Sequence, residues 1–333
     1  MNFKEGRWNH EINVTDFVKT NITPYEGDAS FLAGPTERTK AVWNKCLEAL
    51  AEERANNGVR SLDPSTVSTI TSFAAGYIDK DNEVIVGLQT DEVLRRAIKP
   101  FGGIKVVEKA CRENGVEVDP KVKDIFTHYR KTHNDGVFDA YTEEIRSFRS
   151  LGFLTGLPDN YARGRIIGDY RRLALYGIDR LIEAKQDDLR HLTGPMTDER
   201  IRLREEVAEQ IKALKEIKVM GQQYGLDLSR PATTAQEAVQ WVYMAYLAAV
   251  KEQDGAAMSL GNVSSFLDIY IEYDMAHGNL DELHAQELID QFVIKLRMVR
   301  HLRMQAYTDI FAGDPTWVTE SIGGRFNDGR TKV

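Results

Sequence analysis

Four arginines and four glycines gather in the 21 residues from 152 to 172, the segment richest in groups that could bind an anion. The arginines are Arg163, Arg165, Arg171 and Arg172. A guanidinium donates two parallel hydrogen bonds to a carboxylate or phosphate, and the glycines would let such a ligand approach the backbone. The alternative is a helix on which Arg165 and Arg172 share a face with Asp169, so that the arginines pair with nearby acids. The residue types favour that ion-paired helix slightly and leave both interpretations open.

Two further segments combine small or turn-forming residues with a possible binding role. Residues 255–259 are Gly-Ala-Ala-Met-Ser and follow a strongly apolar stretch, so they permit either close ligand approach or tight packing, with packing favoured. Residues 313–324 are rich in turn formers and carry Trp317 in their middle. That tryptophan either lines a pocket or anchors the loop on the core, and composition does not separate the two.

The chain has few candidates for nucleophilic or metal chemistry. Cys46 and Cys111 stand in unrelated segments without C-x-x-C spacing, so we expect both to be core or surface thiols. The seven histidines show no ligand spacing, and residues 79–83 begin like a calcium loop but have Val84 where the sharp turn needs glycine. No dinucleotide or phosphate-binding glycine motif is present. We therefore expect neither a metal nor a tightly bound cofactor.

Helical periodicity dominates the elements that must position these segments. It predicts helices over residues 36–56, 120–131, 197–224, 234–250 and 281–302. Thr36, Asp119 and Asp281 are expected to begin three of them, and Thr234 with Glu237 forms a capping box for a fourth. The run from 238 to 250 is apolar nearly all round, which predicts a helix buried on several sides.

The helix predicted over 197–224 is highly charged, and its charges are expected to form a solvated face. Opposite charges fall at helical spacing in Asp198 with Arg202 and in Glu209 with Lys212. The residues expected to face inward are Ile201, Val207, Ile211, Leu214 and Ile217.

Strand signals are short and few. Residues 83–87 predict one strand, and residues 255–261 predict a buried strand or a tight loop between two helices. Helices separated by short apolar strands indicate a helix-rich α/β fold with a parallel sheet. No repeat or linker divides residues 1–333, so we expect a single region.

Composition limits the possible partners. Forty-three basic and 51 acidic residues give a net charge of −8, which argues against a nucleic-acid binder. No apolar run approaches the roughly 18 residues of a membrane span, and the N-terminus has no signal-peptide core. We expect no membrane association and a cytoplasmic location.

Ten ungapped blocks in one order resemble the N-terminal part of the pyruvate formate-lyase family, the formate C-acetyltransferases, which are glycyl-radical enzymes. The blocks are residues 23–28, 30–34, 85–89, 100–105, 129–134, 136–139, 164–172, 235–238, 295–300 and 320–324. The resemblance implies the N-terminal half of a ten-stranded α/β barrel wrapped by helices. It also implies conversion of pyruvate and coenzyme A to acetyl-CoA and formate in anaerobic glucose fermentation, with CoA as co-substrate. A homodimer and a radical-SAM activating enzyme are the implied partners of the full-length protein.

The resemblance also assigns site residues. Arg165 matches the arginine that clamps the pyruvate carboxylate, and Ala256, Ala257, Phe311 and Trp317 match residues that line the substrate. Phe138 matches a residue on the adenine side of CoA.

Departures from the family pattern limit what the chain is expected to do alone. Phe73 stands where the family usually has a histidine, which puts CoA contacts in question. The cysteine pair, the second substrate arginine and the glycyl-radical loop match nothing in the chain, so no catalytic residue is assigned. We expect an inactive fragment that self-associates through an incomplete barrel. The alternatives are a non-catalytic partner that completes a barrel with a separate chain, and a 2-oxobutyrate formate-lyase.

Overall fold

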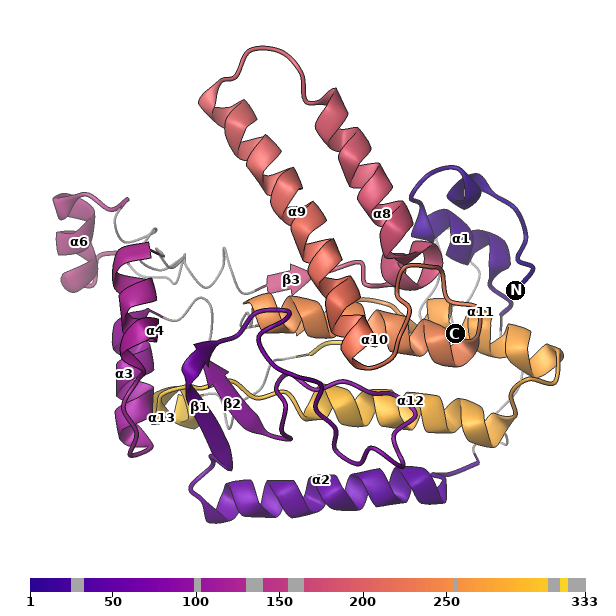
Figure 1. The fold of residues 1–333 in the computed structure, drawn as a ribbon, viewed down its shortest axis with the longest axis horizontal. Helices are drawn as coiled ribbons and strands as arrows, with labels where there is room; N and C mark the ends of the chain where they lie inside the picture. Colours follow the sequence, from indigo (N-terminus) through magenta and orange to yellow (C-terminus); the bar gives the residue numbers. More distant parts are fainter. Residues whose placement is uncertain are drawn as a thin grey trace.

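The computed structural model describes residues 1–24, 33–98, 103–129, 140–154, 165–253, 257–310 and 318–322, and helices make up most of it (Figure 1). The N-terminal part runs through η1 (Arg7–Asn9), α1 (Val14–Asn21), α2 (Glu37–Ala55), β1 (Ser61–Val67), β2 (Arg95–Ile98), α3 (Ile104–Glu113), α4 (Pro120–Asp124), η3 (Ile125–Tyr129) and α6 (Glu143–Ser150). The remainder runs through β3 (Arg165–Ile167), α8 (Arg171–His191), α9 (Asp198–Gln223), α10 (Ala235–Gln253), β4 (Ala257–Ser259), α11 (Ser264–Ala276), α12 (Glu282–Arg297) and α13 (Gln305–Ile310).

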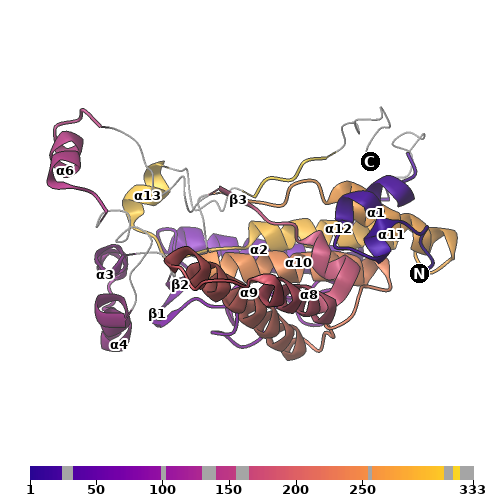
Figure 2. The same cartoon turned by 90° about the horizontal axis from the view of Figure 1, so that it is seen from above.

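Helix α10 is the centre of the main core. It lies among α8, α9, α11 and α12 and contacts all four (Figures 1 and 2). Its residues Trp241, Tyr243, Met244 and Leu247 are all buried. Only a helix without a polar face can be covered on several sides at no polar cost, so the burial predicted from its composition is confirmed.

The predicted capping box at the start of α10 forms by half. The Glu237 N–H donates to Thr234 Oγ1 at 3.1 Å. The Glu237 carboxylate, however, accepts from the Thr233 N–H and from both terminal nitrogens of Arg230. The charged fork of Arg230 displaces the reciprocal bond because charge-assisted pairs are stronger than a neutral cap.

Helices α8 and α9 form an antiparallel hairpin that projects from the body (Figure 1). Thr197 caps α9 by accepting from the Arg200 N–H, and both predicted ion pairs form, Asp198 with Arg202 and Glu209 with Lys212. Val207 is buried, but Ile201 is 44% exposed, so its inward assignment was wrong. The first turns of α9 lie in the projecting part of the hairpin, where fewer elements cover the helix.

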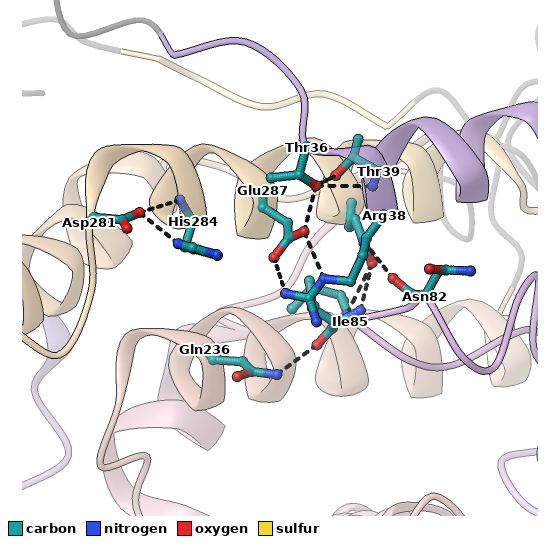
Figure 3. Close-up of polar contacts among 11 residues, drawn as sticks. Thr36, Arg38, Thr39, Asn82, Ile85, Gln236, Asp281, His284 and Glu287 are labelled. Atoms are coloured by element: carbon teal, nitrogen blue, oxygen red, sulfur yellow. Dashed lines mark hydrogen bonds and ion pairs between the residues drawn. The ribbon is translucent and has the colours of Figure 1, made fainter.

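The caps predicted for α2 and α12 both form. Thr36 caps α2 by accepting from the Thr39 N–H, and Asp281 caps α12 by accepting from the His284 N–H. Thr36 also donates to the buried Glu287 of α12, which a bidentate pair with Arg38 neutralises (Figure 3). The helix predicted over 120–131 begins at Pro120 behind its Asp119 cap, but it becomes π-helical at Ile125.

The described residues contain two small parallel sheets. β1 pairs with β2, and Ala97 of β2 forms a further parallel bridge with His301. β3 pairs with β4, and Gly261 beyond β4 forms a parallel bridge with Glu320. The helix-rich α/β fold with parallel pairing is therefore confirmed, and so is a strand within 255–261.

The strand predicted over residues 83–87 does not form. Its backbone lies against α10 and α12, and glutamine side chains take the place of a neighbouring strand. Gln291 Oε1 accepts from the Val84 N–H at 2.7 Å, while Gln240 both accepts from the Val86 N–H and donates to the Val86 carbonyl. Gln236 donates to the Val84 carbonyl (Figure 3). These backbone N–H and carbonyl groups are therefore satisfied without a sheet. The strand predicted from the apolar run alone was wrong.

Within the part of the chain that the structure describes, no helix is both long and apolar enough to cross a membrane.

Candidate functional site

The arginine-rich segment and the Gly-Ala-Ala-Met-Ser segment meet as neighbouring strands. In the parallel pair of β3 with β4, Arg165 lies opposite Ala257, Ile166 opposite Met258 and Ile167 opposite Ser259. β3 leads into α8 and β4 follows α10, two helices that pack directly on each other. The hydrophobic core thereby sets the register of two segments that are distant in the sequence.

A third segment, residues 318–322, lies along the C-terminal end of β4. The Leu260 N–H donates to the Thr319 carbonyl at 2.8 Å, and the Ser321 N–H donates to the Gly261 carbonyl at 2.6 Å. The Glu320 side chain reaches the start of α11, where its Oε1 accepts from the N–H groups of Val263 and Ser264. The described parts of the three segments that the sequence singled out for binding, residues 165–172, 257–259 and 318–322, therefore meet at β4 and the turn that follows it.

The two arginines that begin α8, shortly after β3, are engaged in ion pairs. Arg171 Nε donates to Asp169 at 2.7 Å, and Arg172 lies 3.5 Å from the other oxygen of the same carboxylate. Arg171 Nη1 also donates to the Asn262 carbonyl at 3.3 Å, which ties the β3 end to the β4 end. For these two arginines the ion-pair interpretation is confirmed.

The helix on which Arg165 and Arg172 were to share a face does not exist. Arg165 stands in a strand, and the helix begins only at Arg171. Packing accounts for the glycine at position 168, because a Cβ there would lie 2.6 Å from the Tyr170 ring. Tyr170 is buried and its ring meets the Tyr246 ring of α10 edge-on at 5.5 Å, which seats the β3 end on the core.

The expected substrate residues are placed only in part. The structure gives the backbone positions of Arg165 and Ala257. Four other expected site residues lie outside the described residues: Phe138, Ala256, Phe311 and Trp317. Phe73, at the position where the family usually has a histidine, is buried with 7% of its surface exposed.

Both thiols belong to the hydrophobic core rather than to this site. Cys46 packs with Val42 and Leu94, and Cys111 packs with Val107 and Ala110. Burial raises the pKa of Cys46 to about 12 and also raises the pKa of Cys111, so neither is a ready thiolate. The described residues contain no cluster of side chains suited to a metal ion.

Sequence reasoning gave Glu320 and Asn262 no individual role. Each acts through contacts made far along the chain, Glu320 with residues 263 and 264 and Asn262 with residue 321. Such contacts leave no periodic signal. Glu320 was visible only as the first residue of a block shared with the family.

Comparison with known proteins places these segments in a family pattern. Residues 7–333 match the family model described as pyruvate formate lyase-like. The chain is 56% identical over 336 aligned positions to the formate acetyltransferase of Haemophilus influenzae. That match covers 99% of this chain and 44% of the relative, so the chain spans less than half the length of the protein it resembles.

Solved structures of lower identity share the fold. A glycerol-bound glycerol dehydratase of Clostridium butyricum aligns with a TM-score of 0.66 at 18% identity, covering 92% of this chain and 45% of that one. A hydroxyproline dehydratase of Clostridioides difficile aligns with a TM-score of 0.66 at 15% identity, covering 90% and 45%. A glycyl radical enzyme of Archaeoglobus fulgidus aligns with a TM-score of 0.55 at 16% identity, covering 94% and 44%. The described elements are thus part of a glycyl-radical-enzyme barrel.

Proposed function

The chain belongs to the pyruvate formate lyase-like family, and on that premise we propose that it forms part of the pyruvate pocket of a formate C-acetyltransferase. The whole enzyme would convert pyruvate and coenzyme A to acetyl-CoA and formate. The identity to the Haemophilus formate acetyltransferase supports this reaction over that of the more distant dehydratases.

The register of Arg165 against Ala257 is the observation that carries the proposal. It sets an arginine beside a residue with a minimal side chain on the neighbouring strand. A guanidinium can hold a carboxylate through two parallel hydrogen bonds, and alanine at the paired position would leave room for a three-carbon acid. Arg165 would bind the pyruvate carboxylate, while Ala256, Ala257, Phe311 and Trp317 would enclose the methyl and carbonyl carbons. Phe138 would contact the CoA adenine.

We propose that residues 1–333 have no turnover by themselves. A thiol radical adds to the pyruvate carbonyl in the proposed reaction, and such a step needs an accessible cysteine at the substrate. Cys46 and Cys111 are both fully buried, Cys46 with Val42 and Leu94 and Cys111 with Val107 and Ala110. Neither matches the cysteine pair of the family. The radical glycine, the radical-SAM activating enzyme and a homodimer belong to the proposal for the whole cytoplasmic enzyme.

A chimeric enzyme tests the activity directly. Residues 1–333 would replace the matching part of the Haemophilus formate acetyltransferase, and the product would be activated anaerobically and supplied with CoA. We expect formate from pyruvate at a higher kcat/KM than from 2-oxobutyrate. A preference for 2-oxobutyrate would reassign the substrate.

Two further outcomes would contradict parts of the proposal. A folded chimera that releases formate from neither acid would refute the acyltransferase assignment and favour a non-catalytic role. Formate release by the isolated 333-residue chain, incubated with the activating enzyme, would refute its inactivity.

A further inference from the structure

Glu320 joins the third segment of the proposed site to the turn between β4 and α11, through its backbone and through its side chain. It stands in the segment that runs beside β4, where it forms a parallel bridge with Gly261. Its Oε1 accepts from the N–H groups of Val263 at 2.8 Å and Ser264 at 3.1 Å, the residues that begin α11. One carboxylate oxygen therefore holds the turn between β4 and α11 against a segment more than fifty residues away.

The helix that Glu320 caps has no cap of its own. Val263 occupies the N-cap position of α11 and makes no side-chain cap hydrogen bond. The N–H groups of a first helical turn have no partner within the helix, and a negative charge beside them is favourable. Helices α2, α9 and α12 obtain such caps from Thr36, Thr197 and Asp281, each directly preceding its helix. In α11 the cap comes instead from the third segment of the site.

The turn that Glu320 holds is also hydrogen-bonded to Ser321 and to Arg171. Gly261 has φ +79°, in the left-handed region that favours glycine. Its carbonyl accepts from the Ser321 N–H at 2.6 Å, and Asn262 Nδ2 donates to the Ser321 carbonyl at 2.5 Å. The Asn262 carbonyl in turn accepts a hydrogen bond from Arg171, which follows β3 in the chain. Movement at Glu320 would therefore be transmitted to the C-terminal end of β4.

We propose that Glu320 is a positioning residue for pyruvate, which acts by fixing β4 and with it Ala257 relative to Arg165. This inference rests on the proposed function for the substrate. Glu320 touches neither reacting atoms nor substrate in this account. Its contribution is the acceptor oxygen that sets the β4–α11 turn.

Substitutions at Glu320 separate a positioning role from general stabilisation. In the chimera, Glu320→Ala is expected to raise the KM for pyruvate about tenfold, while kcat and the KM for CoA change less than about threefold. Glu320→Gln keeps the Oε1 acceptor and is expected to stay within about threefold of the unsubstituted chimera in every parameter. The matched control is Thr234→Ala, which removes the cap of α10 at the end of that helix remote from β4. It should lower stability and leave the KM for pyruvate unchanged.

Amide hydrogen exchange on the 333-residue chain gives a readout independent of activity. The Val263 and Ser264 amides should exchange faster in Glu320→Ala than in Glu320→Gln, and Thr234→Ala should leave both rates unchanged. Unchanged exchange rates of these two amides in Glu320→Ala would show that Glu320 does not hold the β4–α11 turn, whatever the activity of the chimera. Faster exchange with an unchanged KM for pyruvate, or a glutamine variant as impaired as the alanine variant, would overturn the positioning role. An inactive unsubstituted chimera would instead refute the proposed function, and the exchange rates would still decide whether Glu320 holds the turn.

Discussion

Arg165 and Ala257 are direct partners in a parallel strand pair, although three long helices, α8, α9 and α10, lie between their strands in the sequence. The register follows from the packing of those helices. α8 follows β3, α10 precedes β4, and the two helices share the central core. A parallel pair requires such a long connection, so the position of Arg165 beside Ala257 depends on how α8 meets α10.

The kink in α8 at Gly177 is therefore expected to be intolerant of substitution. Gly177 has φ +70°, and a Cβ on it would lie 2.4 Å from the Arg230 carbonyl carbon. The Ile178 N–H leaves the helix to bond the Leu228 carbonyl at 2.9 Å. We expect Gly177→Ala to lower the free energy of unfolding by about 2–4 kcal/mol, measured by urea denaturation.

Gly225→Ala is the matched control for that clash. Gly225 has a similar φ of +74°, but nothing lies within 4 Å of the added Cβ. It should cost only about 1 kcal/mol, the conformational part alone. Equal losses in the two variants would show that the contact with residues 229–230 is unimportant.

Much of this core was predictable because its determinants are local. Apolar residues at helical spacing identified α10, and side chains next to helix ends identified the caps Thr36 and Asp281. The failures are non-local. Residues 83–87 resemble a strand, but Gln240 and Gln291, which satisfy their backbone, come from distant helices. Ile201 has the right spacing to face inward and lies where little covers it.

A buried ion pair between Glu83 and Lys295 is expected to carry a large penalty when broken. The two side chains lie 2.7 Å apart and both are fully buried. Burial lowers the pKa of Lys295, which Glu83 partly offsets. Lys295→Met would leave the Glu83 carboxylate without its counter-charge and should lower the free energy of unfolding by about 3–5 kcal/mol.

The double variant Glu83→Gln with Lys295→Met checks the cause of that loss. It removes both charges and keeps an acceptor for the Asp79 N–H, which Glu83 Oε1 accepts at 2.8 Å. We expect it to be more stable than Lys295→Met alone. Lys212→Met, which breaks an exposed pair with Glu209, should cost less than about 0.5 kcal/mol. A double variant less stable than the single would contradict the uncompensated-charge argument.

Glu237 should make the stability of the chain sensitive to acid. The hydrogen-bonded Arg230 guanidinium lowers the pKa of Glu237 to about 2, from its usual value of 4.5. Because the folded pKa lies below the unfolded one, this stabilisation is present above pH 4.5 and is lost as the pH falls towards 2. The pair is partly solvated, so the expected contribution is about 1 kcal/mol.

Thermal melts of the unsubstituted chain and Glu237→Gln between pH 5 and pH 2 would measure that contribution. The difference in stability between the two proteins should shrink as the pH falls. A constant difference across this range would mean that ionisation of Glu237 does not contribute.

The candidate site was predictable as a set of segments rather than as an arrangement. Residue types and the family blocks pointed to Arg165, to residues 255–259 and to residues 313–324. They did not reveal that Arg165 stands in a strand, because a single strand of three residues has no period to detect. They also gave no role to Glu320, whose partners are set by the parallel alignment of the third segment.

Steady-state kinetics of Arg165→Lys in the chimeric enzyme would test the central claim most directly. Lysine keeps the positive charge but cannot make the two parallel hydrogen bonds to a carboxylate. We predict that kcat/KM for pyruvate falls by about a hundredfold, corresponding to about 2.7 kcal/mol. Arg202→Lys, a change of an exposed arginine that pairs with Asp198, should leave kcat/KM unchanged. An Arg165→Lys enzyme that uses pyruvate as well as the unsubstituted chimera would contradict the assignment of Arg165, and with it the pyruvate pocket at β3 and β4.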